Sequence, residues 1–143
     1  MYPKWFCKTI TLYCRYEDTT TKRVSWYRYV IDGAYYKNIS SSALIGNVRI
    51  STESTVCRIR AGSRYLSPNA WLVCENTNKI QSYTLKNGDI VVLGSVSDSI
   101  DEYTAGIRSS DLIAKYRAQG AIKINKVSVN TELGSSHFRV EGN

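Results

Sequence analysis

The alternation of hydrophobic and polar positions is clearest near the start of the chain, in residues 9–16 (TITLYCRY) and 24–31 (VSWYRYVI). Both runs are rich in β-branched and aromatic side chains, which fit a pleated, half-buried surface and lose rotamer freedom in a helix. A charged, threonine-rich segment, EDTTTKR, joins them. The pattern therefore predicts a β-hairpin. In its first strand, a period of two places one set of side chains on the core face: Phe6, Ile10, Leu12 and Cys14.

The pattern changes after this hairpin. Asp32-Gly33 is typical of a turn, and residues 34–37 (AYYK) then predict the start of a third strand. Residues 38–54 contain mostly small polar side chains around one apolar pair and a glycine. We interpret them as a long loop with a function, because long loops in compact domains seldom lack one. Residues 55–60 alternate again and predict a strand with a basic outer face.

The middle of the chain contains a second hairpin signal. Residues 80–85 and 89–96 flank Asn87-Gly88, a dipeptide that tolerates the positive φ values of a tight turn. The later strand is apolar on both faces, which predicts a central position. Residues 69–74 (NAWLVC) fit either a helical turn or a strand. Residues 110–119 predict one amphipathic helix, with a serine hydroxyl at its start and Gly120 at its end.

The last part of the chain predicts two more strands. In residues 121–130 the apolar alternation changes parity between Ile124 and Val127, which predicts a β-bulge near Asn125-Lys126. After the turn TELGSS, residues 137–141 alternate and predict the final strand. We therefore expect a single all-β domain over residues 1–143, a small antiparallel barrel or sandwich of about seven strands with one short helix.

The net charge and the tyrosine content indicate the kind of partner only in general terms. Nineteen basic and twelve acidic residues give a net charge of +7, which favours a polyanion as a partner. The basic residues are dispersed, and their densest stretch contains Arg58, Arg60 and Arg64. A solvated cationic surface explains them better than a dedicated nucleic-acid patch, although both interpretations stay open. Eleven tyrosines against two phenylalanines favour half-wet surfaces and subunit interfaces.

The cysteines and the hydropathy pattern bear on the compartment. The four cysteines have no CxxC pair and no zinc-ligand spacing, so we interpret them as small buried apolar residues. We expect no signal peptide and no membrane-spanning segment. These features predict a protein that is made in a reducing cytosol, where disulfides rarely persist.

A search for catalytic chemistry finds no constellation. The single histidine, His137, lies in a predicted strand and is interpreted as a surface or interface residue. The acidic residues Asp98, Asp101 and Glu102 match no calcium loop and suit the approach to a helix. The serines lack a nucleophile elbow, and the glycines form no phosphate-binding run. We expect neither catalysis nor a cofactor or metal.

Four segments, in this order, resemble small structural proteins of tailed phages and prophages of Gram-positive bacteria. The segments are TITLYCRYEDTTTKRVSWYRYVIDGAYYK, YTLKNGDIVVLGSVSDSID, SSDLIAKY and IKINKVSVNTELGSSHFRVEGN. In size and β-rich composition the chain is similar to the head-closure, or stopper, proteins of the phage neck. The resemblance covers most of the chain except residues 38–54 and 61–79.

The resemblance implies a β-barrel subunit of a ring in the virion, at the head-tail junction. Such a ring of six or twelve copies lies below the portal or adaptor protein and above the tail terminator or tail tube. It continues the channel for double-stranded DNA, helps to retain packaged DNA and provides the surface on which the tail docks. A closed ring needs two unlike contact surfaces on each subunit. Contact with the DNA is expected to be non-specific, through the backbone.

The same resemblance suggests roles for individual residues. By position, the 38–54 loop corresponds to the stopper loop that projects into the channel; its candidate residues are Ser40, Ser41, Ser42, Leu44, Ile45, Asn47 and Arg49. The candidate DNA-facing residues are Arg49, Arg58, Arg60 and Arg64. Contacts with neighbouring subunits or rings are expected from Trp26, Tyr27, Tyr29, Tyr35, Tyr36, His137, Phe138 and Arg139.

Two alternatives remain at this stage. The first is a tail terminator, which forms a ring at the top of the tail tube of the same kind of particle. The second is a monomeric nucleic-acid-binding barrel of the OB type, based on the net charge and on Arg58, Arg60, Tyr27 and Tyr29. Such a module needs aromatic platforms beside a basic groove.

Overall fold

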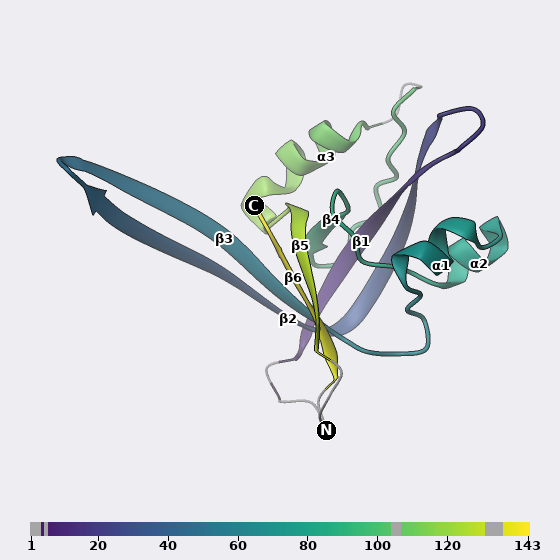
Figure 1. Cartoon of the computed structure of the whole chain (residues 1–143), viewed down its shortest axis with the longest axis horizontal. Coiled ribbons are helices and arrows are strands. Elements are labelled where there is room, and N and C mark those ends of the chain that lie inside the picture. Colours follow the sequence, from purple (N-terminus) through teal and green to yellow (C-terminus); the bar gives the residue numbers. More distant parts are fainter. Residues whose placement is uncertain (1–3, 5, 104–106, 131–135) are drawn as a thin grey trace.

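A computed structural model shows a closed, six-stranded antiparallel barrel with a long two-stranded projection (Figure 1). It describes residues 4, 6–103, 107–130 and 136–143, and only the backbone of 39–43 and 50–53. The strand order around the barrel is β1-β2-β3-β6-β5-β4. The strands are β1 (Lys8–Glu17), β2 (Val24–Ile45), β3 (Val48–Arg60), β4 (Ile90–Leu93), β5 (Ile122–Asn130) and β6 (His137–Gly142). The helices are α1 (Pro68–Val73), α2 (Asn76–Gln81), α3 (Ser109–Tyr116) and a 3-10 turn at Arg117–Gln119.

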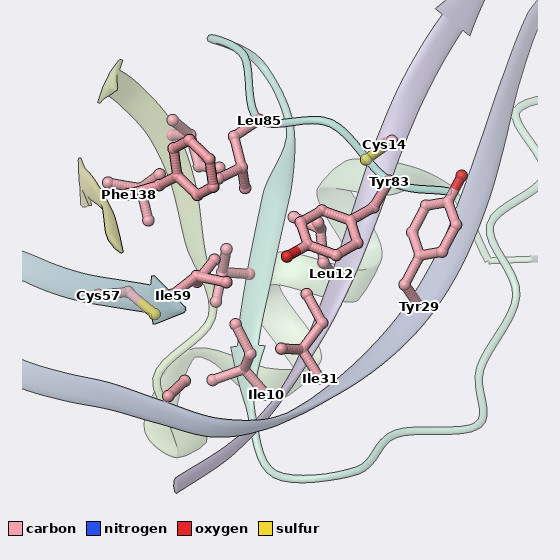
Figure 2. Close-up of a cluster of buried hydrophobic side chains, with 14 of the residues drawn as sticks. Ile10, Leu12, Cys14, Tyr29, Ile31, Cys57, Ile59, Tyr83, Leu85 and Phe138 are labelled. Atoms are coloured by element: carbon pink, nitrogen blue, oxygen red, sulfur yellow. The ribbon is translucent and has the colours of Figure 1, made fainter. Parts of the chain in front are cut away.

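The predicted first hairpin is confirmed, and its alternation builds the barrel interior. β1 pairs with β2 from Glu17↔Val24 to Lys8↔Ala34. Ile10, Leu12 and Cys14 point inward, as the period of two predicts, and have no exposed surface. Figure 2 shows them facing side chains of the other strands and of the segment before β4, among them Tyr29, Ile31, Cys57, Ile59, Tyr83, Leu85 and Phe138. Closure of the barrel leaves these side chains no route to solvent.

A second apolar cluster covers the outer side of β1 and β4. Tyr13, Ile90 and Val92 point out of the barrel and pack under Leu112 of α3. The central position predicted for the strand after Asn87-Gly88 is therefore confirmed, because Val91 faces the interior while its two neighbours face α3. Burial of both faces explains why this strand has no polar alternation.

Residues 32–37 do not form the predicted turn and new strand. β2 runs through them without interruption, and Gly33, with φ +72°, lies in a bulge where the β1–β2 register shifts between Lys8 and Ile10. Glycine adopts this positive φ at no steric cost, which favours an extra residue in the strand. The same dipeptide that favours a reversal therefore bends a continuous strand here, and the barrel has six strands instead of about seven.

Residues 38–54, predicted as a long loop, are instead the outer half of a β-hairpin. β2 and β3 continue to pair residue by residue from Tyr35↔Arg58 to Ile45↔Val48, and Gly46-Asn47 form the turn. The prediction was wrong because the run of small polar residues between 38 and 54 gives no apolar alternation. We call residues 39–54 the arm. It extends away from the barrel in Figure 1.

The second predicted hairpin is also wrong in its first strand. Residues 76–81 form α2, and Ile80 is exposed on it. Residues 69–74, which the sequence left ambiguous, fall mainly in α1. Together α1 and α2 form a small cap at residues 68–81, which we call the two-helix lobe.

Two buried side chains fasten the lobe to the barrel. Trp71 is fully buried; its Nε1 donates to the carbonyl of Ser82 at 3.0 Å. Lys79 is also buried, and its Nζ donates to the carbonyl of Cys74 at 2.5 Å and lies over the Tyr16 ring at 4.6 Å. A buried ammonium needs such partners, so Lys79 ties α2 to the end of α1.

The predicted bulge near Asn125-Lys126 and the final strand are both confirmed. The β5–β6 register passes from Ile124↔Gly142 to Lys126↔Glu141, which leaves Asn125 as the extra residue. At this point Gly142 lies so close to the backbone of Lys123 that a Cβ atom would collide with the Lys123 carbonyl oxygen. The turn at 131–135 lies outside the described residues.

The helix predicted at 110–119 is present as α3 and the following 3-10 turn. Its start differs from the serine cap that was expected. No side chain of the N-cap residue caps the helix, and the Glu102 carboxylate accepts a hydrogen bond from the Ser109 amide at 2.9 Å. An acid ahead of the helix therefore replaces the hydroxyl.

Candidate functional site

The arm is the first candidate site, because nothing in the described chain covers it. Its strands pair only with each other: the β1–β2 ladder ends at Ala34, and the β3–β6 ladder begins at Thr55. Both outer edges of the ribbon therefore offer unpaired backbone groups. An isolated two-stranded ribbon is marginally stable in water, and free edges are templates for pairing with another chain.

The tip of the arm, residues 44–49, is apolar. Leu44, Ile45 and Val48 expose 68%, 64% and 63% of their surfaces. Arg49 is the only charged residue of the tip and is also exposed. Of the residues predicted for the channel loop, the structure thus places Leu44, Ile45, Asn47 and Arg49 together at the far end. The side chains of Ser40, Ser41 and Ser42 lie outside what the structure describes.

A basic face on the outside of β3 and β6 is the second candidate site. Cross-strand pairing sets Tyr35 beside Arg58, and Arg58 beside Arg139. The Arg58 guanidinium lies over the Tyr35 ring, 5.4 Å from its centroid. Two pairs along, and therefore on the same face, Arg60 pairs with His137. The fold thus gathers Arg58, Arg60 and Arg139, which are scattered in the sequence, into neighbouring positions.

Only part of this positive charge is neutralised within the face. Glu141 accepts from Arg139 at 2.9 Å, and its other oxygen lies 3.8 Å from Lys126 Nζ. The Nε atoms of Arg58 and Arg139 are buried and have no hydrogen-bond partner among the described residues. Guanidinium groups beside an aromatic ring suit contact with phosphate oxygens, which carry no sequence information.

The edge of the basic face is fixed by the N-terminal segment. Arg60 donates to the carbonyl of Phe6 at 3.0 Å, and its side chain packs against Gly33. The His137 ring meets Phe6 edge-on, with centroids 5.9 Å apart. Its Nε2 lies 3.4 Å from Asn130 Nδ2. Arg60 and His137 therefore have structural partners here as well as partial exposure to solvent.

Two residues predicted for subunit contacts belong to the core instead. Tyr29 is 2% exposed and Phe138 is 6% exposed. The Tyr29 hydroxyl donates to the carbonyl of Lys79, and the Phe138 ring stacks on Tyr65 with centroids 4.1 Å apart. Their rings face the interior, so the contact role predicted for them is wrong.

The other predicted contact residues are partly exposed and spread over several sides of the barrel. Tyr27 meets Trp71 edge-on, and its hydroxyl donates to Asn76 Oδ1 at 3.3 Å. Trp26 packs against the cluster under α3. Tyr36 donates to the Gly120 carbonyl at 2.8 Å. None of these three rings is a free platform for stacking, since each already packs within the chain.

Of the other predicted DNA-facing residues, Arg64 lies apart from the basic face. It follows β3 and donates from Nε to the Gln81 carbonyl at 3.4 Å, next to the two-helix lobe. Arg49 lies at the arm tip. The arginines predicted together are therefore divided among three places, and two of them, Arg58 and Arg60, share one.

The acidic residues ahead of α3 have structural partners. Asp98 accepts from Lys115 Nζ at 2.9 Å and from the Tyr116 hydroxyl at 2.8 Å, and these hydrogen bonds lower its pKa. Burial alone would raise the pKa of Glu102, but the hydrogen bonds from Ser109, together with Trp26 and the charge of Arg108, outweigh burial and lower it. Both carboxylates therefore stay ionised at neutral pH and hold α3 in place.

Buried thiols and phenols have raised pKa values. Burial raises the pKa of Cys57 to about 12, and burial together with the nearby Asp89 raises the pKa of Cys14 well above its usual range. Cys7 is exposed and Cys74 is partly exposed. The prediction of four buried cysteines is therefore right for two of them.

One cavity of about 330 Å³ opens beside α3 and is lined by Arg15, Trp26, Ile90, Ser109, Ile113 and Lys123 among others. Its lining combines apolar side chains with two cations. Within the described ranges, no three His, Cys, Asp or Glu side chains meet as a metal site. Among these same residues, no helix has the length and hydropathy needed to cross a bilayer.

Sequence reasoning missed the arm and part of the basic face. Gly46-Asn47 between apolar neighbours is a signal for a two-residue hairpin turn, and it predicts the pairing of Ile45 with Val48. Lys126 and Glu141 could not have been assigned to the basic face without the β5–β6 register.

Comparison with known proteins gives one match, to a family model. No curated protein and no solved structure matches the chain. A family model matches residues 6–143, which include the barrel, the arm and α3. The chain therefore belongs to the family of unknown function DUF6751.

Proposed function

We propose that this protein is a neck protein of a tailed phage or prophage, a ring subunit that helps to close the head and receives the tail. The observation that carries the proposal is the arm, a ribbon that leaves a small closed barrel. It contains the residues that the sequence resemblance aligns with the stopper loop. The sequence resemblance supplies the biological setting, and the arm supplies a part that a monomeric barrel does not need.

A paired ribbon such as the arm suits the wall of a ring better than an unpaired loop would. Its seven backbone pairs, from Ile39↔Ser54 to Ile45↔Val48, fix its direction relative to the barrel. At about 3.3 Å per residue, seven residues span roughly 23 Å. A ribbon of that reach from each copy extends well beyond its own barrel and gives the ring a defined inner or lateral surface.

The basic face suits a DNA channel. Arg58, Arg60, Arg139 and Lys126 offer charge on one side of the barrel, partly balanced by Glu141. A genome that passes through a channel must be attracted without being held. Modest, partly neutralised charge gives weak backbone contact that weakens further as salt rises.

Particle assembly tests the proposal directly. In an induced prophage or phage whose copy of this gene is disabled, we expect DNA-filled heads that lose their DNA and do not join to complete tails. Supply of the wild-type protein to these heads should restore joining. Gold label on the protein should lie at the head-tail junction of complete virions.

The same experiment distinguishes the alternatives. Tails of irregular length, with protein that binds free tails and not heads, would identify a tail terminator. Normal particles without this protein, and label elsewhere, would contradict both ring functions. Salt-dependent binding of the purified monomer to single-stranded DNA, with loss on Arg58→Gln, would then favour the nucleic-acid-binding barrel.

A further inference from the structure

Two exposed apolar surfaces lie at opposite ends of the molecule. One is the arm tip, with Leu44, Ile45 and Val48. The other is the two-helix lobe, where Leu72, Val73 and Ile80 expose 39%, 85% and 66% of their surfaces. In Figure 1 the arm extends to the left of the barrel, and α1 and α2 lie on its right. Within one copy the two surfaces cannot meet.

The charges of the two surfaces are complementary. Arg49 is the only charged residue at positions 44–49, and it is exposed. At positions 68–81 the charged residues are Glu75, which is exposed, and Lys79, whose ammonium is buried against backbone carbonyls. Neither Arg49 nor Glu75 forms an ion pair with any residue that the structure describes. Glu75 is thus the only exposed charged side chain at positions 68–81.

We propose that the arm tip of one copy docks on the two-helix lobe of the next copy. Ile45 and Val48, which pair across the ribbon and share one of its faces, bury against Leu72, Val73 and Ile80, and the long side chain of Arg49 at the rim lies next to Glu75. The occupant is a second copy of this chain, because the chain itself supplies the apolar tip, the apolar seat and a matched pair of charges. The contact joins two unlike surfaces, so it is head-to-tail and repeats from copy to copy.

This inference deepens the proposed function and rests on it for one point, the closure of the repeated contact into a ring. The contact itself does not depend on the biological setting. The contact also determines where the arm lies in the ring. An arm that docks on the next copy runs along the wall of the ring, so it lines the channel and does not close it.

Complementation between two variants tests the contact. Ile45→Lys disrupts the apolar surface of the tip and leaves the lobe unchanged. Val73→Lys disrupts the apolar surface of the lobe and leaves the tip unchanged. Both positions are exposed, so both variants should keep the wild-type circular dichroism spectrum and melting temperature. In analytical ultracentrifugation we expect the wild type to form oligomers with rising concentration, and each variant alone to stay monomeric. An equimolar mixture of the two variants should form dimers and nothing larger. Only one contact can form, between the intact tip of the Val73→Lys variant and the intact lobe of the Ile45→Lys variant.

A control and a charge exchange sharpen the test. Val129→Lys changes an exposed apolar residue on β5 that belongs to neither surface, and it should assemble as the wild type does. Arg49→Glu or Glu75→Lys alone should weaken association by up to about fivefold, the range of an exposed ion pair. The two changes together in one chain should restore it.

Several outcomes would overturn the contact. They are a wild type that stays monomeric at every concentration, tip variants that assemble normally, and lobe variants that assemble while tip variants do not. If the contact fails while the protein still lies at the head-tail junction, the neck function stands without it. If the contact is found but the label lies elsewhere, the neck function fails and the head-to-tail assembly remains.

Discussion

The two halves of β3 show how one strand can be held in two ways. Between Thr55 and Arg58 the strand pairs with β2 on one side and β6 on the other, and Cys57 and Ile59 are fully buried. Between Val48 and Ser54 it pairs with β2 alone. The barrel half is stabilised by burial within the chain. Among the described residues the arm half has only its ladder with β2, and a two-stranded ribbon of this kind is marginally stable in water.

The largest expected effect comes from comparing two substitutions in the same strand, one in the barrel and one in the arm. Ile59→Ala removes a fully buried side chain and should lower the free energy of unfolding by about 2–5 kcal/mol. Val48→Ala in the arm should change it by less than about 0.5 kcal/mol. Urea denaturation of the monomeric protein measures both. Equal losses would show that the arm packs against the barrel in solution.

The next effect concerns a close approach of backbones in the barrel. Gly142→Ala places a methyl group against the Lys123 carbonyl at the β5 bulge, and overpacking of this kind should cost about 1–3 kcal/mol of unfolding free energy. Gly62→Ala is the control, since nothing lies within 4 Å of its Cβ position. Similar melting temperatures for both variants would contradict the observed geometry of the bulge.

The rate of thiol modification compares the accessibility of the two halves of β3 without a substitution in the core. Burial raises the pKa of Cys57 to about 12, whereas a cysteine at the exposed position of Val48 should have an ordinary pKa. In Val48→Cys at pH 8, the arm thiol should react with a disulfide reagent about a thousandfold faster than Cys57. Cys7 is also exposed and should react early, so Cys7→Ser is included. Fast modification of Cys57 in native protein would contradict a closed barrel.

The smallest expected effect concerns an ion pair on the surface of the barrel. Such a pair should contribute as little to the free energy of unfolding as an exposed residue of the arm does. Hydrogen bonds from Lys115 and Tyr116 lower the pKa of Asp98 in the folded protein. Its contribution to stability is therefore present above the unfolded-state pKa and is lost as pH falls through the lower, folded-state value. The difference in unfolding free energy between wild type and Asp98→Asn should be small at pH 7 and should disappear in acid. A difference that grows as pH falls would contradict the shift.

The sequence predicted the parts of the fold in which apolar side chains alternate regularly with more polar ones. Ile10, Leu12 and Cys14 alternate with polar residues, and Val127 follows Ile124 out of phase, so the hairpin and the bulge could both be located. The arm could not be located in this way, because Ser40, Ser41 and Ser42 carry no alternation. Residues 80–85 were misassigned because Asn87-Gly88 favours a turn but does not identify the strand that enters it.

The candidate sites were less predictable than the fold, for a physical reason. Arg58 and Arg139 are 81 positions apart in the sequence and become neighbours only through the β3–β6 register. Tyr29 and Tyr35 lie in the same strand and look equivalent in composition. The bulge at Gly33 separates them, and one ring enters the core while the other joins the basic face. Local pattern cannot fix such pairings.

The continuity of β2 and β3 from barrel to arm has a mechanical consequence. A pull on the tip along the strands is carried into the β1–β2 and β3–β6 ladders, whose hydrogen bonds lie across the direction of pull. Such a load is shared by many bonds at once, as in shear, and does not open them one after another. In the proposed ring, the ribbon would therefore carry tension between adjoining subunits, which suits the proposed role in retaining packaged DNA.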